Sequence, residues 1–230
     1  MPQADLPTSW SLLQGAAAGD DALRSQFASR YEAAIRNYLR HRWRGQPALE
    51  HLEDAVQDTF LECLKPGGVL VRAEEGKGEF RALLYGVVRN VARRHEEKMA
   101  RSYQRRAGAP SGLDEVPADA DGLSTAFDRA WAQAVLQQAA QEHRATAQLA
   151  GADAAQRQEI LRLRHDESLP VREIATRLGI EDVDAVHNDY RRARREFSRH
   201  LKAVLQAHTG TQGAELEAQL RRLPELISSK

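Results

Sequence analysis

The sequence predicts an all-α protein of two small helical domains joined by a linker, and three observations support this. Apolar residues recur at steps of three and four over most of the chain, as they do in amphipathic helices. No run of alternating β-branched residues bounded by turns is present, so strands are not expected. A stretch rich in Gly, Pro, Ala and Asp at 107–125 interrupts the helical pattern and marks the linker.

Length, composition and cysteine content limit the class of protein. The chain has 230 residues, of which 29% are charged and 42% hydrophobic, so it can bury a core. It has no run of about 18 apolar residues and no basic start followed by an apolar leader. We therefore expect a cytoplasmic protein without membrane insertion. The single Cys63 excludes an internal disulfide and a cysteine-rich zinc site, and we expect no metal and no cofactor.

Basic and acidic residues balance at 33 each but are unevenly distributed. Residues 89–106 hold seven basic and two acidic side chains, and residues 187–202 hold six basic and two acidic ones. Between them, residues 110–156 hold seven acidic and two basic side chains. Two basic patches are typical of contact with a polyanion at two places, although basic helices are equally often ordinary solvated faces.

The first part of the chain predicts three helices before a loop. A short helix covers 10–18, Asp residues at 20 and 21 cap a longer one over 22–43, and a third spans 49–64. Pro66-Gly67-Gly68 ends the third helix and opens a loop to Gly78. We expect the buried faces to contain Phe27, Tyr31, Ile35, Tyr38 and Leu39 in the second helix, and Leu52, Val56, Thr59, Phe60 and Cys63 in the third.

A fourth helix is predicted from near Phe80 and has two distinct faces. One face is an apolar stripe that consists of Phe80, Leu83, Leu84, Val87, Val88 and Val91. The opposite edge carries Arg81, Tyr85, Arg89 and Arg93, each four residues from the next. This spacing places three cations and an aromatic ring along one exposed line.

The second part of the chain predicts a helix over 124–149 and three more within 154–201. The middle one of the three spans 171–178, Gly179 supplies a turn, and a longer basic helix begins near Asp182. A short helix, a Gly-containing turn and a longer basic helix are the signature of a helix-turn-helix. Residues 215–227 predict a short amphipathic helix.

No catalytic pattern is present. Gly76-Lys77 lacks the remaining residues of a phosphate-binding loop, because Val71 stands where the first Gly belongs and Gly78 where Ser or Thr belongs. The eight histidines show no metal-ligand spacing, and no G-x-S-x-G elbow occurs. We therefore do not expect an enzyme.

Three segments share their pattern with one family. Residues 52–61 (LEDAVQDTFL) resemble the most recognisable helix of sigma region two, and residues 80–90 (FRALLYGVVRN) resemble the promoter-melting helix that follows it. Residues 156–161 (QRQEIL) and 171–180 (VREIATRLGI), with 191–195 (RRARR), are similar to sigma region four. In order and spacing, the chain resembles an extracytoplasmic-function (ECF) RNA polymerase sigma factor of the sigma-70 family, over about residues 20–100 and 154–202.

The resemblance implies a sigma factor, not an enzyme, that binds core RNA polymerase, recognises promoter elements and promotes DNA melting for transcription initiation. It implies a region-two helical bundle at 8–106, the linker at 107–125, a region-four helix-turn-helix domain with a leading helix at 126–202, and a C-terminal tail at 203–230. The implied partners are the β′ clamp helices and β flap of core RNA polymerase, promoter DNA and, as in many members, an anti-sigma factor.

The family's polymerase-binding positions correspond to Asp54, Gln57 and Asp58. These residues fall outside the apolar stripe of their helix and within about one turn of each other. Two carboxylates and an amide suit a basic helical partner. Without the surrounding motif they would equally well form a solvated acidic face.

The loop over 65–78 and the following helix correspond to the part of the family that captures unpaired bases of the minus-ten element. Such capture requires cations along the backbone and flat faces or pockets for bases, and each stacked base contributes about 1–3 kcal/mol. Leu83 replaces a Trp common in the family and is expected in the core. We expect backbone contacts from Lys77, Arg81, Arg89, Arg93 and Arg94, and base contacts from Asn90 and Tyr85, although Tyr85 is equally compatible with a place in the core.

The last helix of the helix-turn-helix is expected to enter the major groove of the minus-thirty-five element. This helix departs from the family, because it reads DAVHN where TVKSR is frequent and has one extra residue after Ile180. The carboxylates of Asp184 and Asp189 would repel phosphates. We expect base contacts from Asp184, His187 and Asn188 and phosphate contacts from Arg191, Arg192 and Arg195.

Two other functions fit part of these observations. A stand-alone helix-turn-helix regulator would use the second domain alone and would not bind polymerase. A sigma-like antagonist would bind polymerase without reading promoter DNA.

Overall fold

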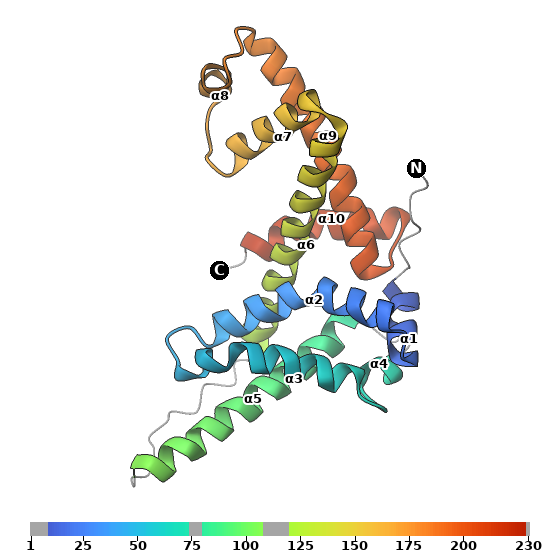
Figure 1. Ribbon diagram of the computed structural model, residues 1–230, viewed down its shortest axis with the longest axis vertical. Coiled ribbons are helices and arrows are strands. Elements are labelled where there is room, and N and C mark those ends of the chain that lie inside the picture. The colour runs from blue at the N-terminus through green and yellow to red at the C-terminus, as the bar shows by residue number, and fades with distance from the viewer. Residues whose placement is uncertain (1–8, 74–79, 108–119, 229–230) are drawn as a thin grey trace. The chain divides into compact units, whose positions relative to one another are not determined.

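The helical periodicity of the sequence is realised along the chain. The computed structural model describes residues 9–73, 80–107 and 120–228, and within these ranges its regular structure is entirely helical (Figure 1). The predicted all-α class is therefore confirmed. The chain divides into two compact units, the first formed by Met1–Ala134 with Gln206–Lys230 and the second by Val135–Leu205.

The first unit begins with helices α1 (Ser9–Ala18), α2 (Asp21–Arg42) and α3 (Leu52–Leu64), with a 3-10 turn, η1, over Pro47–His51. The side chain of Asp20 accepts a hydrogen bond from the Leu23 amide at 3.0 Å and so caps α2, as predicted. All five apolar residues expected on the inner face of α2 are buried, and Phe27 and Tyr38 are fully enclosed. Burial of such rings is a large contribution to the core.

Helix α5 (Phe80–Ala107) packs along α3 and completes the helical core of the first unit. Leu84, Val88 and Val91 are fully buried, as the apolar stripe predicts. Leu83 is 40% exposed, so the expectation that it lies in the core is wrong. A one-turn helix, α4 (Val69–Arg72), interrupts the predicted loop and lies near this part of α5, where it contributes to the groove described below.

A charged cluster fixes the middle of α5 against the end of α2. The Glu96 carboxylate accepts hydrogen bonds from Arg42 Nε at 2.7 Å and Nη2 at 2.9 Å, and from the Trp43 indole Nε1 at 2.7 Å. The Arg42 side chain is only 8% exposed and the Glu96 side chain 20%. The pair fixes the position of α5 along α2, because a shift that separated Arg42 from Glu96 would leave a largely buried charge without its partner.

The first unit also contains parts of the chain that the sequence assigns elsewhere. The start of α6 (Ala120–Ala150), the end of α9 (Val183–Thr209) and all of α10 (Gly213–Ser228) belong to it. The buried Arg30 donates from Nη1 to the Ala207 carbonyl at 2.6 Å, and the Tyr31 hydroxyl donates to the His208 carbonyl at 3.2 Å. These bonds satisfy carbonyls that the end of α9 leaves without helical partners.

The unit bounds therefore differ from the predicted domain bounds. Residues 126–134, expected in the second domain, pack in the first unit, where Phe127 and Trp131 are 1% and 3% exposed. The expected tail at 203–230 is helical to Thr209, and the amphipathic helix predicted at 215–227 is confirmed as α10. Most of the expected linker, 108–119, lies outside the described residues.

The second unit contains the rest of α6, then α7 (Ala152–His165), α8 (Val171–Leu178) and α9 as far as Leu205. Gly179 closes α8 in the left-handed conformation at φ 66°, which a residue with a side chain adopts only at a cost. A small core of Ile160, Leu163, Ile174, Ala175 and Val186 joins α7, α8 and α9. The predicted sequence of short helix, turn and long basic helix is thus present.

None of the helices within residues 9–73, 80–107 and 120–228 combines the length and the apolarity that crossing a membrane requires.

Candidate functional site

An acidic edge runs along the exposed side of α3. It consists of Asp54, Gln57 and Asp58, with Leu61 one turn further along the same side. The side chain of Asp54 is 71% exposed and that of Asp58 is 49% exposed, and Gln57 is exposed. Leu61 is 58% exposed and so adds a large apolar side chain to this surface. The edge therefore combines anionic groups with an apolar contact point.

Two histidines that sequence reasoning did not single out stand behind this edge. His95 Nε2 lies 2.9 Å from Asp58 Oδ2, and His51 Nδ1 lies 3.5 Å from Asp54 Oδ2. The His95 ring is held between the rings of Trp43 and His51, with centroids 6.1 Å and 6.4 Å away. Because His95 is on α5, no spacing in the sequence predicts that it meets α3. The pairing orients Asp58 at the surface.

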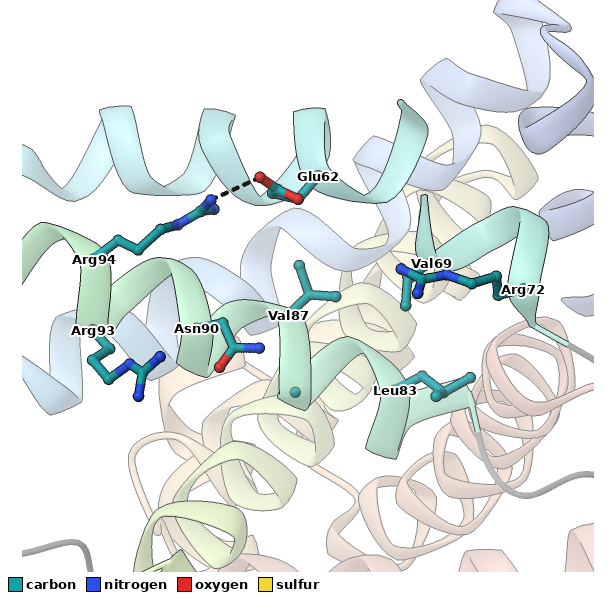
Figure 2. A pocket seen from close by; sticks show the side chains of 9 residues that line it. Glu62, Val69, Arg72, Leu83, Val87, Asn90, Arg93 and Arg94 are labelled. Atoms are coloured by element: carbon teal, nitrogen blue, oxygen red, sulfur yellow. Dashed lines mark hydrogen bonds and ion pairs between the residues drawn. The ribbon is translucent and has the colours of Figure 1, made fainter. Parts of the chain in front are cut away.

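A groove of about 380 Å³ lies between the end of α3, α4 and the first half of α5 (Figure 2). Its apolar part is lined by Val69, Leu83 and Val87, which explains why Leu83 is exposed, and Gly86 leaves open space beside it. Its polar lining comes from Glu62, Arg72, Asn90, Arg93 and Arg94.

Glu62 organises the cationic side of the groove. Its carboxylate accepts from Arg94 Nη1 at 2.9 Å and pairs with Lys65 Nζ at 2.5 Å, and Figure 2 shows the Arg94 bond crossing between the two helices. The hydrogen bonds from Lys65 and Arg94 lower the pKa of Glu62, so the carboxylate stays ionised. Neither Glu62 nor Arg72 was predicted, because their relevance depends on the position of α4.

The residues predicted for the minus-ten element separate into three groups. Asn90, Arg93 and Arg94 line the groove, and Arg89 is exposed on the same helix. Lys77 lies outside the described residues. Arg81 and Tyr85 are engaged by other residues of the first unit.

Arg81 and Tyr85 both contact the start of α6. Arg81 Nε lies 2.8 Å from Asp128 Oδ1, and its Cζ lies 4.4 Å from the centroid of the Trp131 ring. The Tyr85 ring packs against Phe127 and Tyr38, with centroids 5.5 Å and 5.9 Å away. Burial in this cluster raises the pKa of Tyr38 to about 12. The structure therefore places Tyr85 among core residues, one of the two positions that the sequence left open.

The basic face of α9 lies in the second unit. The side chains predicted for the minus-thirty-five element are all exposed on this helix, and they recur at helical spacing along one broad side. The Asp184 amide donates to the Asp182 carboxylate at 2.9 Å, which caps the first turn. The exposed set comprises Asp184, His187, Asn188, Arg191, Arg192 and Arg195.

Chemically, the three surfaces differ in what they accept. The acidic edge suits a basic helix with an apolar contact. The groove suits a flat group beside an anion, because apolar side chains and three arginines line it together. The α9 face suits the phosphates and base edges of a duplex. Compared with models of known protein families and with curated proteins, the sequence matches none.

Proposed function

We propose that this protein is a sigma-type transcription initiation factor of the ECF kind. It binds core RNA polymerase through the acidic edge of α3, holds unpaired promoter DNA at the groove between α4 and α5, and reads duplex promoter DNA with α9. It acts by binding and does not catalyse a reaction itself.

The observation that carries this proposal is the presence of a separate cationic surface on each compact unit. The groove of the first unit is lined by Arg72, Arg93 and Arg94, and the exposed face of α9 in the second unit carries Arg191 and Arg195. A stand-alone helix-turn-helix regulator needs only the second of these surfaces. Two nucleic-acid surfaces on two units fit a protein that contacts a promoter at two elements.

The groove supports the melting step in physical terms. Extracting a base from a duplex costs a few kcal/mol, and stacking or enclosure of the base elsewhere must offset that cost. The apolar wall of Leu83 and Val87 supplies enclosure, and Asn90 supplies both a donor and an acceptor for a base edge. Arg93 lines the same groove and would hold the adjoining phosphate.

The acidic edge supports the polymerase contact. Asp54, Gln57 and Asp58 face outward on one helix, and Leu61 extends the same side. Because exposed charges alone give little affinity, the apolar side chain is needed to bury surface in the complex. His95 holds Asp58 in place before binding, which reduces the entropy lost on association.

The first experiment tests polymerase binding with the full chain. Replacing Asp54, Gln57 and Asp58 together by Lys should abolish capture of purified core RNA polymerase in a pull-down. A control with Gln148→Lys and Asp153→Lys, both exposed in the second unit, should be captured like the wild type. Capture of the triple variant at the wild-type level would reject the polymerase contact and favour a stand-alone regulator.

The second experiment tests promoter opening. With purified core polymerase, Arg89→Glu combined with Arg93→Glu should reduce opening of promoter DNA more than it reduces polymerase binding. An equal loss of both would reject the assigned role of α5. Absence of a promoter-specific transcript from any genomic fragment with the wild-type chain would instead favour the antagonist.

A further inference from the structure

The line of residues along α5 has two ends in different environments. Arg81, Tyr85, Arg89 and Arg93 follow one another at four-residue steps. Arg89 and Arg93 are exposed, whereas the Arg81 side chain is only 20% exposed and the Tyr85 hydroxyl is buried. One half of a continuous cationic and aromatic line is therefore open to solvent, and the other half is covered.

The covering segment, called the cover below, is residues 127–131 near the start of α6. The chemistry of its side chains resembles that of a nucleotide. Asp128 places a carboxylate oxygen 2.8 Å from Arg81 Nε, which is the contact that a phosphate oxygen would make. The Trp131 indole lies 4.4 Å from Arg81 Cζ, as a stacked base would. The Phe127 ring packs against Tyr85, the next side chain along the line, with ring centroids 5.5 Å apart and the planes tilted by 45°. An anion and two flat rings thus occupy consecutive positions on α5.

The cover is also attached to the C-terminal end of α9. The Trp131 ring also makes an edge contact with His208, with ring centroids 6.1 Å apart. His208 in turn packs on Tyr31 of α2 at 5.5 Å, and Arg30 holds the adjacent Ala207 carbonyl. The C-terminal segment therefore supports the position of Trp131 over Arg81.

We infer that the start of α6 is an internal competitor of single-stranded DNA, which occupies the Arg81–Tyr85 half of the α5 line until nucleic acid displaces it. The inference rests on the proposed function, because it requires that α5 binds unpaired DNA. DNA that first engages Arg89 and Arg93 gains the remaining contacts only when Asp128 and Trp131 leave Arg81. The intramolecular contact thereby weakens binding of free single strands.

Asp128→Asn in the full chain tests the competition, because it removes the anion and keeps the side-chain size. The probe is a fluorescein-labelled, mixed-sequence single-stranded DNA of about 16 nucleotides, followed by anisotropy. We expect binding about three- to fivefold tighter than wild type, the factor for losing a partly exposed ion-pair competitor. The slope of log affinity against log salt should steepen by about 0.7, which corresponds to one added phosphate contact.

Matched variants separate the possible outcomes. Asp153→Asn makes the same charge change in the second unit and should leave affinity and slope unchanged. Arg81→Gln should have little effect alone but should cancel the gain in the Asp128→Asn background. An Asp128→Asn variant that binds like Asp153→Asn would overturn the inference and leave the proposed function intact. Absence of single-strand binding by every variant, wild type included, would instead reject the proposed function.

A measurement on the wild-type chain covers the case in which Asp128→Asn does not fold. Trp131 is 3% exposed, so its displacement by DNA should shift its emission to longer wavelength. Trp131→Phe, which keeps a ring at this position, should lose that shift while Trp10 and Trp43 still report. Saturating single-stranded DNA that leaves the Trp131 emission unchanged would show that the cover is never displaced.

Discussion

His208 should make the stability of the first unit depend on pH. The side chain is 5% exposed between Tyr31 of α2 and Trp131 of α6. Burial, and then the positive charge of Arg30, lower its pKa to about 3, whereas a histidine in an unfolded chain titrates near about 6.5. At a pH between these two pKa values, His208 is protonated in the unfolded chain and neutral in the folded chain. Stability therefore falls as the pH drops from about 6.5 towards 3.

The magnitude follows from the two pKa values. Between pH 7 and pH 5 the folded His208 stays neutral while the unfolded one becomes almost fully protonated. The corresponding loss in the free energy of unfolding is about 2 kcal/mol. Each pH unit below the pKa of the unfolded histidine costs about 1.4 kcal/mol, and pH 5 lies about one and a half units below that pKa. That is a large part of the stability of a typical domain.

Urea unfolding at pH 7 and pH 5 measures the effect. His208→Phe keeps an aromatic ring against Tyr31 and Trp131 but cannot titrate, so it should lose about 2 kcal/mol less than wild type on acidification. The difference between the two proteins isolates His208 from His143 of the second unit, whose pKa is also lowered by burial. His41→Gln, at an exposed position on α2, controls for loss of a histidine. Equal acid sensitivity of wild type and His208→Phe would refute the placement of His208.

Four further substitutions test the fold and the surfaces. Gly68→Ala should lower the free energy of unfolding by about 1–3 kcal/mol, because a Cβ would lie 2.7–2.8 Å from three backbone carbonyl oxygens. Gly86→Ala should raise the free energy of unfolding by about 0.5–1 kcal/mol, because the added Cβ meets open space in a helix. Thermal melts in which Gly68→Ala and Gly86→Ala shift the melting temperature in the same direction would contradict these two expectations. Glu96→Gln should cost about 3 kcal/mol in urea unfolding, since it leaves the Arg42 guanidinium without its counter-charge, and a loss below about 1 kcal/mol would argue against that pairing. Arg191→Ala should reduce the salt slope of duplex DNA binding by about one while weakening all sequences alike, and a change confined to one sequence would indicate base contact instead.

The elements of the fold could largely be predicted from the sequence because their signals are local. The Asp20 cap, the buried face of α2 and the turn at Gly179 each depend on residues within a few positions of one another. The position of one helix relative to another that is distant in the sequence has no such local signal. The apolar stripe of α5 indicates that Leu83 is buried, but whether a given position on the stripe is covered depends on where α4 lies.

The candidate site shows the same limit more strongly. The outward direction of Asp54 and Asp58 follows from helical periodicity, whereas the histidines behind them come from η1 and α5. Arg81 matches the pattern of a DNA-contacting cation, yet Asp128, 47 positions later, is its partner in the structure. Local patterns identify which side chains are charged and exposed on a helix; tertiary packing decides which of them are already occupied.

Cys63 gives the wild-type chain its own reporter. The thiol is fully enclosed on the inner side of α3, and burial together with the charge of Glu62 raises its pKa to about 12. Only the thiolate reacts with alkylating reagents, so modification must wait until this part of the molecule opens. As the sole sulfhydryl of the chain, it allows iodoacetamide labelling to time the opening of the first unit separately from the second, with no engineered label.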